Sequence, residues 1–247
     1  MRRPVFLSID PEAPFPPAET ALRQPDGLLA IGGDLAPQRL LNAYRHGIFP
    51  WYSEGQPILW WTPDPRMVFR SGGVRLSSRF RRDLRRSTWQ VRADTAFAGV
   101  MAACAETPRR GQDGTWITDA MQSAYLELHR LGHAHSVEVF DQGRLVGGLY
   151  GVAIGRMFFG ESMYSGESGG SKVALAALAH RLSGWGWPLI DAQVENPHLL
   201  SLGAESWPRA DFLARVAELT GFTGTVGSWT APFGALEASA LAETGAG

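Results

Sequence analysis

The feature that most constrains the fold of this chain is a β-β-α-β pattern in its second half. Two apolar segments, 145–154 and 156–163, have the length and the β-branched or aromatic content of strands, and a single glycine separates them, which predicts a β-hairpin. Apolar residues then recur at helical spacing over 173–182, before two glycines and a proline. A third short strand is expected at 189–193. The sequence therefore predicts an α/β (α+β) structure with a mixed sheet.

Three polar residues interrupt this otherwise apolar unit. Glu161 lies within the second strand, where a carboxylate is costly to bury unless a partner compensates it. Asp191 and Gln193 lie on the third strand, and the two-residue period of a strand places them on one face. We expect the candidate catalytic centre at these three residues.

The chemistry available to these groups is acyl transfer to an amine. A side-chain amide is too weak a base to remove a proton outright, but Gln193 can accept a hydrogen bond from an attacking amine while Asp191 holds its NH₂ group. An α-amino group has a pKa of about 7.7–8.0, so part of it is already neutral near pH 7.5. Orientation beside an activated ester then supplies most of the rate. Glu161 suits a cationic acceptor side chain.

Length and composition set the wider limits. The 247 residues, 45% hydrophobic, can bury the core of one large or two modest domains. A net charge of −1 gives no overall attraction to a polyanion, so any RNA contact must use a local patch. The single cysteine, Cys104, excludes an intrachain disulfide. With no signal peptide and no apolar run of about 18 residues, we expect a cytoplasmic protein without a membrane span.

The chain divides into two expected parts. Residues 1–65 are rich in Pro, Gly and Trp, contain one clear helix at 37–46, and predict a small irregular module whose large rings pack against another domain. Residues 66–247 form the larger domain. Its Ala- and Gly-rich tail from about residue 235 is expected to be mobile.

A basic helix is expected early in the larger domain, capped by Ser77. Its sequence offers two interpretations, because a charge run is usually a solvated helix face. Five arginines within eight positions, against one aspartate, favour a patch that contacts nucleic-acid phosphates. The five are Arg79, Arg81, Arg82, Arg85 and Arg86.

A serine hydrolase is the main alternative function. The segment 166–170 matches G-x-S-x-G between a strand and a helix, and Asp191 and His198 follow Ser168 in the chain order of a nucleophile-elbow hydrolase. Only one helix and one strand fit between Ser168 and Asp191, whereas that fold separates its triad by several elements. The hydrolase is therefore the less favoured hypothesis.

Metal and cofactor chemistry is also disfavoured. His129, His133 and His135 have spacings that metal sites use, but no cysteine or clustered carboxylate completes a ligand set, so neither a metal nor a cofactor is expected. An acyl-CoA-dependent acetyltransferase remains a second alternative. The Arg/Gln-x-x-Gly-x-Gly loop that such an enzyme needs before the helix at 173–182 is missing.

Several motifs, in order, resemble those of the leucyl/phenylalanyl-tRNA-protein transferase family: DGLLAIGGDL, GIFPWY, WWTPDPR, TWIT, GESMYSG, SKVALAAL and LIDAQVENPHLLSLGA, spanning about 15–216. The resemblance implies an acetyltransferase-like (GNAT) fold. It also implies a monomer that moves Leu or Phe, and also Met, from aminoacyl-tRNA to the α-amino group of proteins beginning with Arg or Lys, which marks them as N-degrons.

The resemblance also assigns site residues. It gives catalysis to Asp191 and Gln193, and the catalytic or acceptor-binding centre to Glu161. The pocket for the aminoacyl group and terminal adenosine falls to Trp51, Trp116, Leu149, Phe158, Met163, Leu175 and Leu178. In a regular strand Phe158 and Met163 would face opposite sides, so a shared pocket requires a bulge or a strand end. The sequence departs from the family pattern at Gly166, often Arg, and at Ala192, often Cys.

Overall fold

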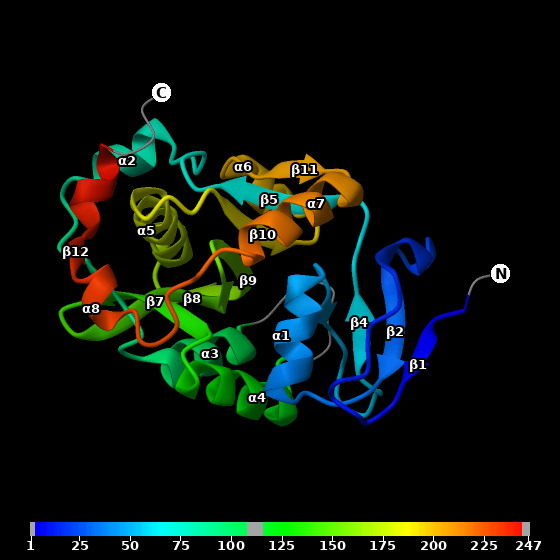
Figure 1. Cartoon of the computed structure of the whole chain (residues 1–247). Coiled ribbons are helices and arrows are strands. Elements are labelled where there is room, and N and C mark those ends of the chain that lie inside the picture. The colour runs from blue at the N-terminus through cyan, green and yellow to red at the C-terminus, as the bar shows by residue number, and fades with distance from the viewer. Residues whose placement is uncertain (1–2, 108–115, 244–247) are drawn as a thin grey trace.

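A computed structural model describes residues 3–107 and 116–243 of the chain (Figure 1). The strands are β1 (Val5–Leu7), β2 (Leu28–Gly32), β3 (Phe49–Pro50), β4 (Leu59–Trp61), β5 (Arg66–Arg70), β6 (Gln90–Ala93), β7 (Ala134–Asp141), β8 (Arg144–Ile154), β9 (Met157–Ser165), β10 (Leu189–Gln193), β11 (Glu205–Trp207) and β12 (Leu236–Glu237). The α-helices are α1 (Pro37–Arg45), α2 (Ser78–Leu84), α3 (Phe97–Glu106), α4 (Asp119–Arg130), α5 (Gly170–Gly184), α6 (Pro197–Ser201), α7 (Arg209–Thr220) and α8 (Thr230–Phe233). Two short 3₁₀ helices are η1 (Ala18–Thr20) and η2 (Ala238–Ala242).

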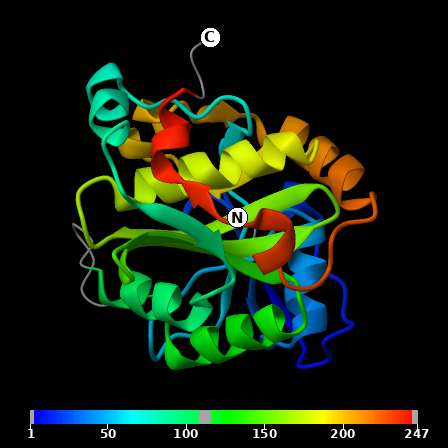
Figure 2. The same ribbon diagram turned by 90° about the vertical axis from the view of Figure 1, so that its left-hand side faces the viewer.

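The larger sheet has eight strands in the order β11-β5-β10-β9-β8-β7-β6-β12. Within it β9 and β10 pair in parallel and the other neighbours pair antiparallel. Figure 2 shows α5, in yellow, on one face and α3 and α4, in green, on the other. The predicted mixed α/β class is confirmed. In the described part of the chain, no helix combines the length and apolar composition needed to cross a bilayer.

The predicted β-β-α-β unit forms the middle of this sheet. Strands β8 and β9 make the hairpin, α5 crosses one face, and β10 returns beside β9. Gly155 turns the hairpin at φ +61°, and a Cβ there would lie 2.3 Å from the Leu219 carbonyl oxygen, so a side chain is excluded. Gly147 lets α5 approach closely, because its Cβ would lie 2.4 Å from the backbone of Gly170.

The N-terminal part is more regular than predicted. Four of its segments form a second sheet in the order β1-β2-β4-β3, standing at one end of the molecule (Figure 1). The expectation of an irregular module was wrong, whereas the helix predicted at 37–46 is present as α1. These strands are only two to five residues long and rich in Gly, Pro and Trp, so their two-residue period is hidden. Tyr44 and Trp60 share one apolar core with α3, α4 and β8.

The expectation of a mobile tail from about residue 235 was also wrong for the described residues. Strand β12 pairs with β6, and η2 packs against α2 and α5. Ala238 and Leu241 are fully buried. Alanine-rich composition suggested mobility, but small side chains also allow a segment to pack closely against two helices.

Candidate functional site

A cavity of about 610 Å³ opens where β3, the middle of the larger sheet and α5 meet. Its walls contain every residue that the sequence assigned to the catalytic centre and the aminoacyl pocket. These are Trp51, Trp116, Leu149, Phe158, Glu161, Met163, Leu175, Leu178, Asp191 and Gln193. Ten residues from a stretch of 143, from 51 to 193, thus line one cavity.

A β-bulge at Glu161 makes the shared apolar wall possible. The pairing of β9 with β8 slips between Gly160 and Ser162, so Glu161 is the extra residue. The slip reverses the alternation of side chains, and Phe158 and Met163 both reach the cavity. The bulge that the sequence required is therefore present. Leu175 and Leu178 of α5 complete this wall from above the sheet.

Gln193 ends β10 in a left-handed backbone conformation, with φ +61°. Its side-chain Nε2 donates to Oε1 of Glu161 at 2.7 Å. With Nε2 donating here, the amide oxygen of Gln193 is not engaged by Glu161. The amide oxygen is left as the acceptor that the residue offers to the cavity it lines.

Asp191 is completely buried and forms a bidentate ion pair with Arg66. Arg66 Nε lies 2.8 Å from Oδ1 and Nη2 lies 2.6 Å from Oδ2. The guanidinium also lies over the rings of Phe49 and Phe212, at 4.7 and 4.6 Å. Oδ1 of Asp191 accepts from the backbone N–H of Gln193 at 2.9 Å. The prediction that Asp191 holds the Gln193 side-chain NH₂ was wrong: it holds the main chain instead.

Glu161 is only 9% exposed and is surrounded by neutral donors. Tyr44 donates to Oε1 at 2.7 Å and Tyr125 to Oε2 at 3.0 Å. Burial raises the pKa of Glu161 to about 8, although both tyrosine hydrogen bonds oppose the shift. Burial also raises the pKa of Tyr44 and of Tyr125 well above the usual range, so both phenols keep their protons.

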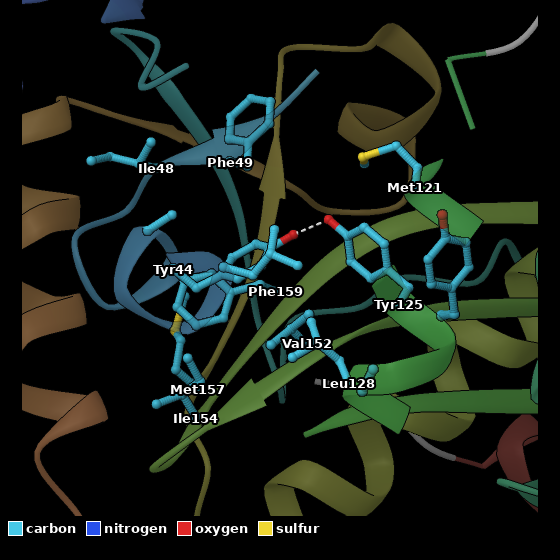
Figure 3. Close-up of a cluster of buried hydrophobic side chains, with 14 of the residues drawn as sticks. Tyr44, Ile48, Phe49, Met121, Tyr125, Leu128, Val152, Ile154, Met157 and Phe159 are labelled. Atoms are coloured by element: carbon cyan, nitrogen blue, oxygen red, sulfur yellow. Dashed lines mark hydrogen bonds between the residues drawn. The ribbon is translucent and has the colours of Figure 1, made fainter. Parts of the chain in front are cut away.

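The two tyrosines also contact each other. Figure 3 shows Tyr44 from α1 and Tyr125 from α4 pointing together, with their hydroxyls hydrogen-bonded. Three oxygen–oxygen contacts close this triangle, but the phenols supply two protons. A proton on Glu161 provides the third only when the carboxyl donates to one phenol, which in turn donates to the other. Burial raises the pKa of Glu161 to about 8, and this makes Glu161 mainly a neutral acid near pH 7.

Comparison with known proteins gives consistent matches along the chain. The family model described as leucyl/phenylalanyl-tRNA protein transferase matches residues 68–217, and that of its N-terminal domain matches 33–64. A transferase of that name from Xanthomonas euvesicatoria pv. vesicatoria (strain 85-10) is 74% identical over 243 residues, covering 98% of this chain and 97% of that protein. The chain belongs to the leucyl/phenylalanyl-tRNA–protein transferase family. It is therefore an aminoacyltransferase.

Other matches agree with this family or add little to it. A family member from Xylella fastidiosa (strain 9a5c) is 68% identical over 231 residues, covering 94% of this chain and 95% of that protein. Among solved structures, a GCN5-related N-acetyltransferase from Kribbella flavida matches with a TM-score of 0.37 and 11% identity, over 70% of this chain and 61% of that one. That TM-score is too low to carry an argument.

The basic helix is α2, none of whose residues lines the cavity. Ser77 caps it by accepting from the backbone N–H of Phe80, as predicted. Phe80 packs near the start of α5, with the Lys172 ammonium 5.6 Å from its ring. Four of the five arginines are exposed and Arg81 is half-buried. Arg85 pairs with Glu243 at 3.0 Å.

The rival chemistries find no assembled site in this family member. Both oxygens of Asp191 are held by Arg66, so Asp191 cannot orient His198 for attack by Ser168. Two of the predicted metal-spaced histidines have structural partners: His135 pairs with Asp94 at 2.9 Å, and His129 bonds the Ala134 carbonyl. Within 3–107 and 116–243, three or more His, Cys, Asp or Glu residues are nowhere grouped to hold a metal.

Three residues of the transferase site were missed at the sequence level. Tyr44 and Tyr125 lie on the buried faces of α1 and α4 and look like ordinary core residues. Arg66 opens β5, whose next three residues are all buried. An arginine in such a strand is costly without a partner, so the search for partners that singled out Glu161 could have found Arg66 as well.

Proposed function

We propose that this protein transfers Leu or Phe, and also Met, from aminoacyl-tRNA to the α-amino group of proteins that begin with Arg or Lys, marking them as N-degrons. One observation carries the proposal. Gln193 is held at its side chain by Glu161 and at its backbone by Asp191, in a cavity with an apolar wall. A fixed neutral acceptor beside an apolar pocket suits an amine attacking an ester.

The reaction needs only positioning and proton management from the protein. The Gln193 amide oxygen accepts a hydrogen bond from the neutral α-amine, which attacks the carbonyl carbon of the aminoacyl ester. The new C–N bond forms, the bond to the ribose oxygen breaks, and the proton lost by the amine balances the proton gained by that oxygen. Asp191 and Glu161 hold Gln193 in place, so their contribution is pre-organisation.

The apolar wall accounts for the proposed choice of amino acid. Leu149, Phe158, Met163, Leu175 and Leu178 offer no charge and no strong hydrogen-bonding group to a side chain entering between them. Burial of Leu, Phe or Met there gains about 1.5–3 kcal/mol, whereas a polar side chain loses its hydration. We assign the terminal adenosine to Trp51 and Trp116, whose rings also line the cavity.

The exposed arginines support the proposed contact with tRNA. A cationic face on α2 adjoins the start of α5, whose Leu175 and Leu178 reach the cavity. An acceptor stem lying on α2 would place its 3′ end toward that cavity. Phosphate contacts of this kind hold any tRNA without reading its bases.

The test is a transfer assay with purified protein, charged Leu-tRNA and three peptides that begin with Arg, Lys or Ala. We expect a product with Leu joined to the α-amine of the Arg and Lys peptides and little product with the Ala peptide. Labelling of Ser168 by a fluorophosphonate would instead indicate a hydrolase. Acetyl transfer from acetyl-CoA to the same peptides would indicate an acetyltransferase.

A further inference from the structure

The cavity is lined for a cation. Among the described residues of its wall there are three carboxylates, Glu161, Asp191 and Glu195, and no Lys, Arg or His. A space with acidic groups and no bases favours a positively charged side chain over a neutral or negative one. The proposed acceptor brings such a side chain, so one of these carboxylates must meet it.

Two of the three carboxylates already have hydrogen-bond or ion-pair partners within the protein. Asp191 is fully buried and both of its oxygens are bound by Arg66, which neutralises its charge. Glu161 is hydrogen-bonded to Tyr44, Tyr125 and Gln193, and burial raises its pKa to about 8, so it is mainly uncharged near pH 7. A cation gains little from either group, and displacing those donors would release Gln193 from its position.

Glu195 lacks comparable partners among the described residues. Its side chain is exposed, and its Oε2 accepts one long hydrogen bond, 3.4 Å, from the Ser206 hydroxyl. The described residues include no cation within ion-pair distance of it. Its neighbour Val194 and, on α6, Leu199 also line the cavity and provide apolar surface for the methylenes of a long side chain.

The spacing from Gln193 fits this role. Two residues of extended chain span at most about 7 Å, which is comparable to the reach of an Arg or Lys side chain from its own α-carbon. An acceptor whose α-amine is hydrogen-bonded to Gln193 can therefore place its side-chain cation at Glu195. The left-handed turn at Gln193 ends the strand, so the chain leaves the sheet as it runs along the cavity.

We infer that Glu195, and not Glu161, reads the positive charge of the acceptor's first residue. The inference deepens the proposed function and rests on it. Glu195 is a specificity residue at the cavity mouth, while Glu161 positions Gln193 inside. The sequence-based expectation gave the acceptor's charge to Glu161 and the Gln193 side chain to Asp191, whereas Glu161 is the residue that holds that side chain.

The experiment measures kcat/KM with Leu-tRNA for an Arg-starting and an Ala-starting peptide in wild type, Glu195→Gln and Glu161→Gln. Glu195→Gln should lower the Arg-over-Ala ratio about fivefold, the upper range for an exposed ion pair, mainly through KM for the Arg peptide. Glu161→Gln should lower kcat for both peptides and leave the ratio unchanged. Glu195→Lys should lower the ratio further and improve transfer to an Asp-starting peptide.

Controls separate failure of the inference from failure of the proposed function. Glu54→Gln removes an exposed carboxylate that does not line the cavity, and it should match wild type. If wild type itself shows no preference for Arg over Ala, the proposed function fails. If wild type has the preference and Glu195→Gln keeps it, or Glu161→Gln alone loses it, the assignment of Glu195 is overturned.

Discussion

Two buried carboxylates flank Gln193, and the protein treats them in opposite ways. Asp191 meets a full positive charge, the bidentate guanidinium of Arg66, in a fully buried pair. Glu161 meets only neutral donors, two tyrosines and an amide. In the first arrangement a cation compensates the buried carboxylate, and in the second burial raises the pKa of Glu161 to about 8.

The difference shows how one residue can be fixed from two sides without leaving free charge in the cavity. A second ionised carboxylate beside Asp191 would repel it, and their interaction indeed contributes to the raised pKa of Glu161. Holding the Gln193 side chain with a neutral acid avoids that repulsion. Among the described residues of the cavity wall, Glu195 is then the exposed carboxylate.

The largest expected effect on stability comes from removing Arg66, the charged partner of Asp191. Arg66→Ala leaves Asp191 buried without a partner, which should lower the free energy of unfolding by about 3–5 kcal/mol. Urea unfolding followed by circular dichroism measures it. The double variant Arg66→Met with Asp191→Asn removes both charges and should recover part of the loss. A change below about 1 kcal/mol in Arg66→Ala would mean that water or another cation replaces the guanidinium.

The hydrogen bonding of Glu161 to neutral donors predicts that the free energy of unfolding changes with pH by roughly 3 kcal/mol. The folded protein keeps the Glu161 proton up to its pKa of about 8, whereas the unfolded chain loses it near the usual glutamate pKa of 4.5. The stabilisation is complete below about pH 4.5 and is lost as pH rises through 8. Relative to Glu161→Gln, wild type should therefore lose roughly 3 kcal/mol of unfolding free energy between pH 5 and 8. Glu218→Gln, an exposed carboxylate change on α7, should keep the wild-type slope.

A smaller effect on stability is expected from replacing solvent-exposed arginines. In contrast to Arg66, Arg82 and Arg86 on and after α2 are exposed, so replacing both by Ala should leave stability nearly unchanged. The double variant should instead reduce the salt dependence of tRNA binding by about 0.7–0.9 units of log–log slope per lost contact, equally for any charged tRNA. Arg130→Ala with Arg215→Ala, on other helices, is the matched control. An unchanged slope in the α2 variant would mean that α2 is a solvated helix face and does not contact tRNA phosphates.

The fold was predictable where sequence periodicity and packing agree. The β8–β9 hairpin, α5 and β10 were expected within a few residues of their observed bounds, because long apolar segments and glycine turns are strong local signals. The strands of the N-terminal sheet were missed, since pairs such as β3 with β4 hold only two residues in register. The packed η2 segment was missed because alanine-rich composition resembles that of a tail.

A residue of the candidate site could be predicted only where its burial in an apolar segment is visibly costly from the sequence. Glu161, Asp191 and Gln193 stood out because polar groups interrupt apolar strands. Their partners did not, because the phenols of Tyr44 and Tyr125 come from helices 81 positions apart, and no local pattern links them. The sequence could require a bulge or a strand end for Phe158 and Met163 to share a pocket, but its position at Glu161 and the hydrogen-bond partners of that carboxyl group depend on tertiary packing.

The most direct test of the central claim is the transfer activity of Gln193→Ala. The measurement is kcat/KM for Leu transfer from Leu-tRNA to an Arg-starting peptide, with Ser168→Ala as the control. We predict a loss of at least about 100-fold for Gln193→Ala, with unfolding free energy and Leu-tRNA binding unchanged, and wild-type activity for Ser168→Ala. Activity of Gln193→Ala within a few-fold of wild type would contradict the account.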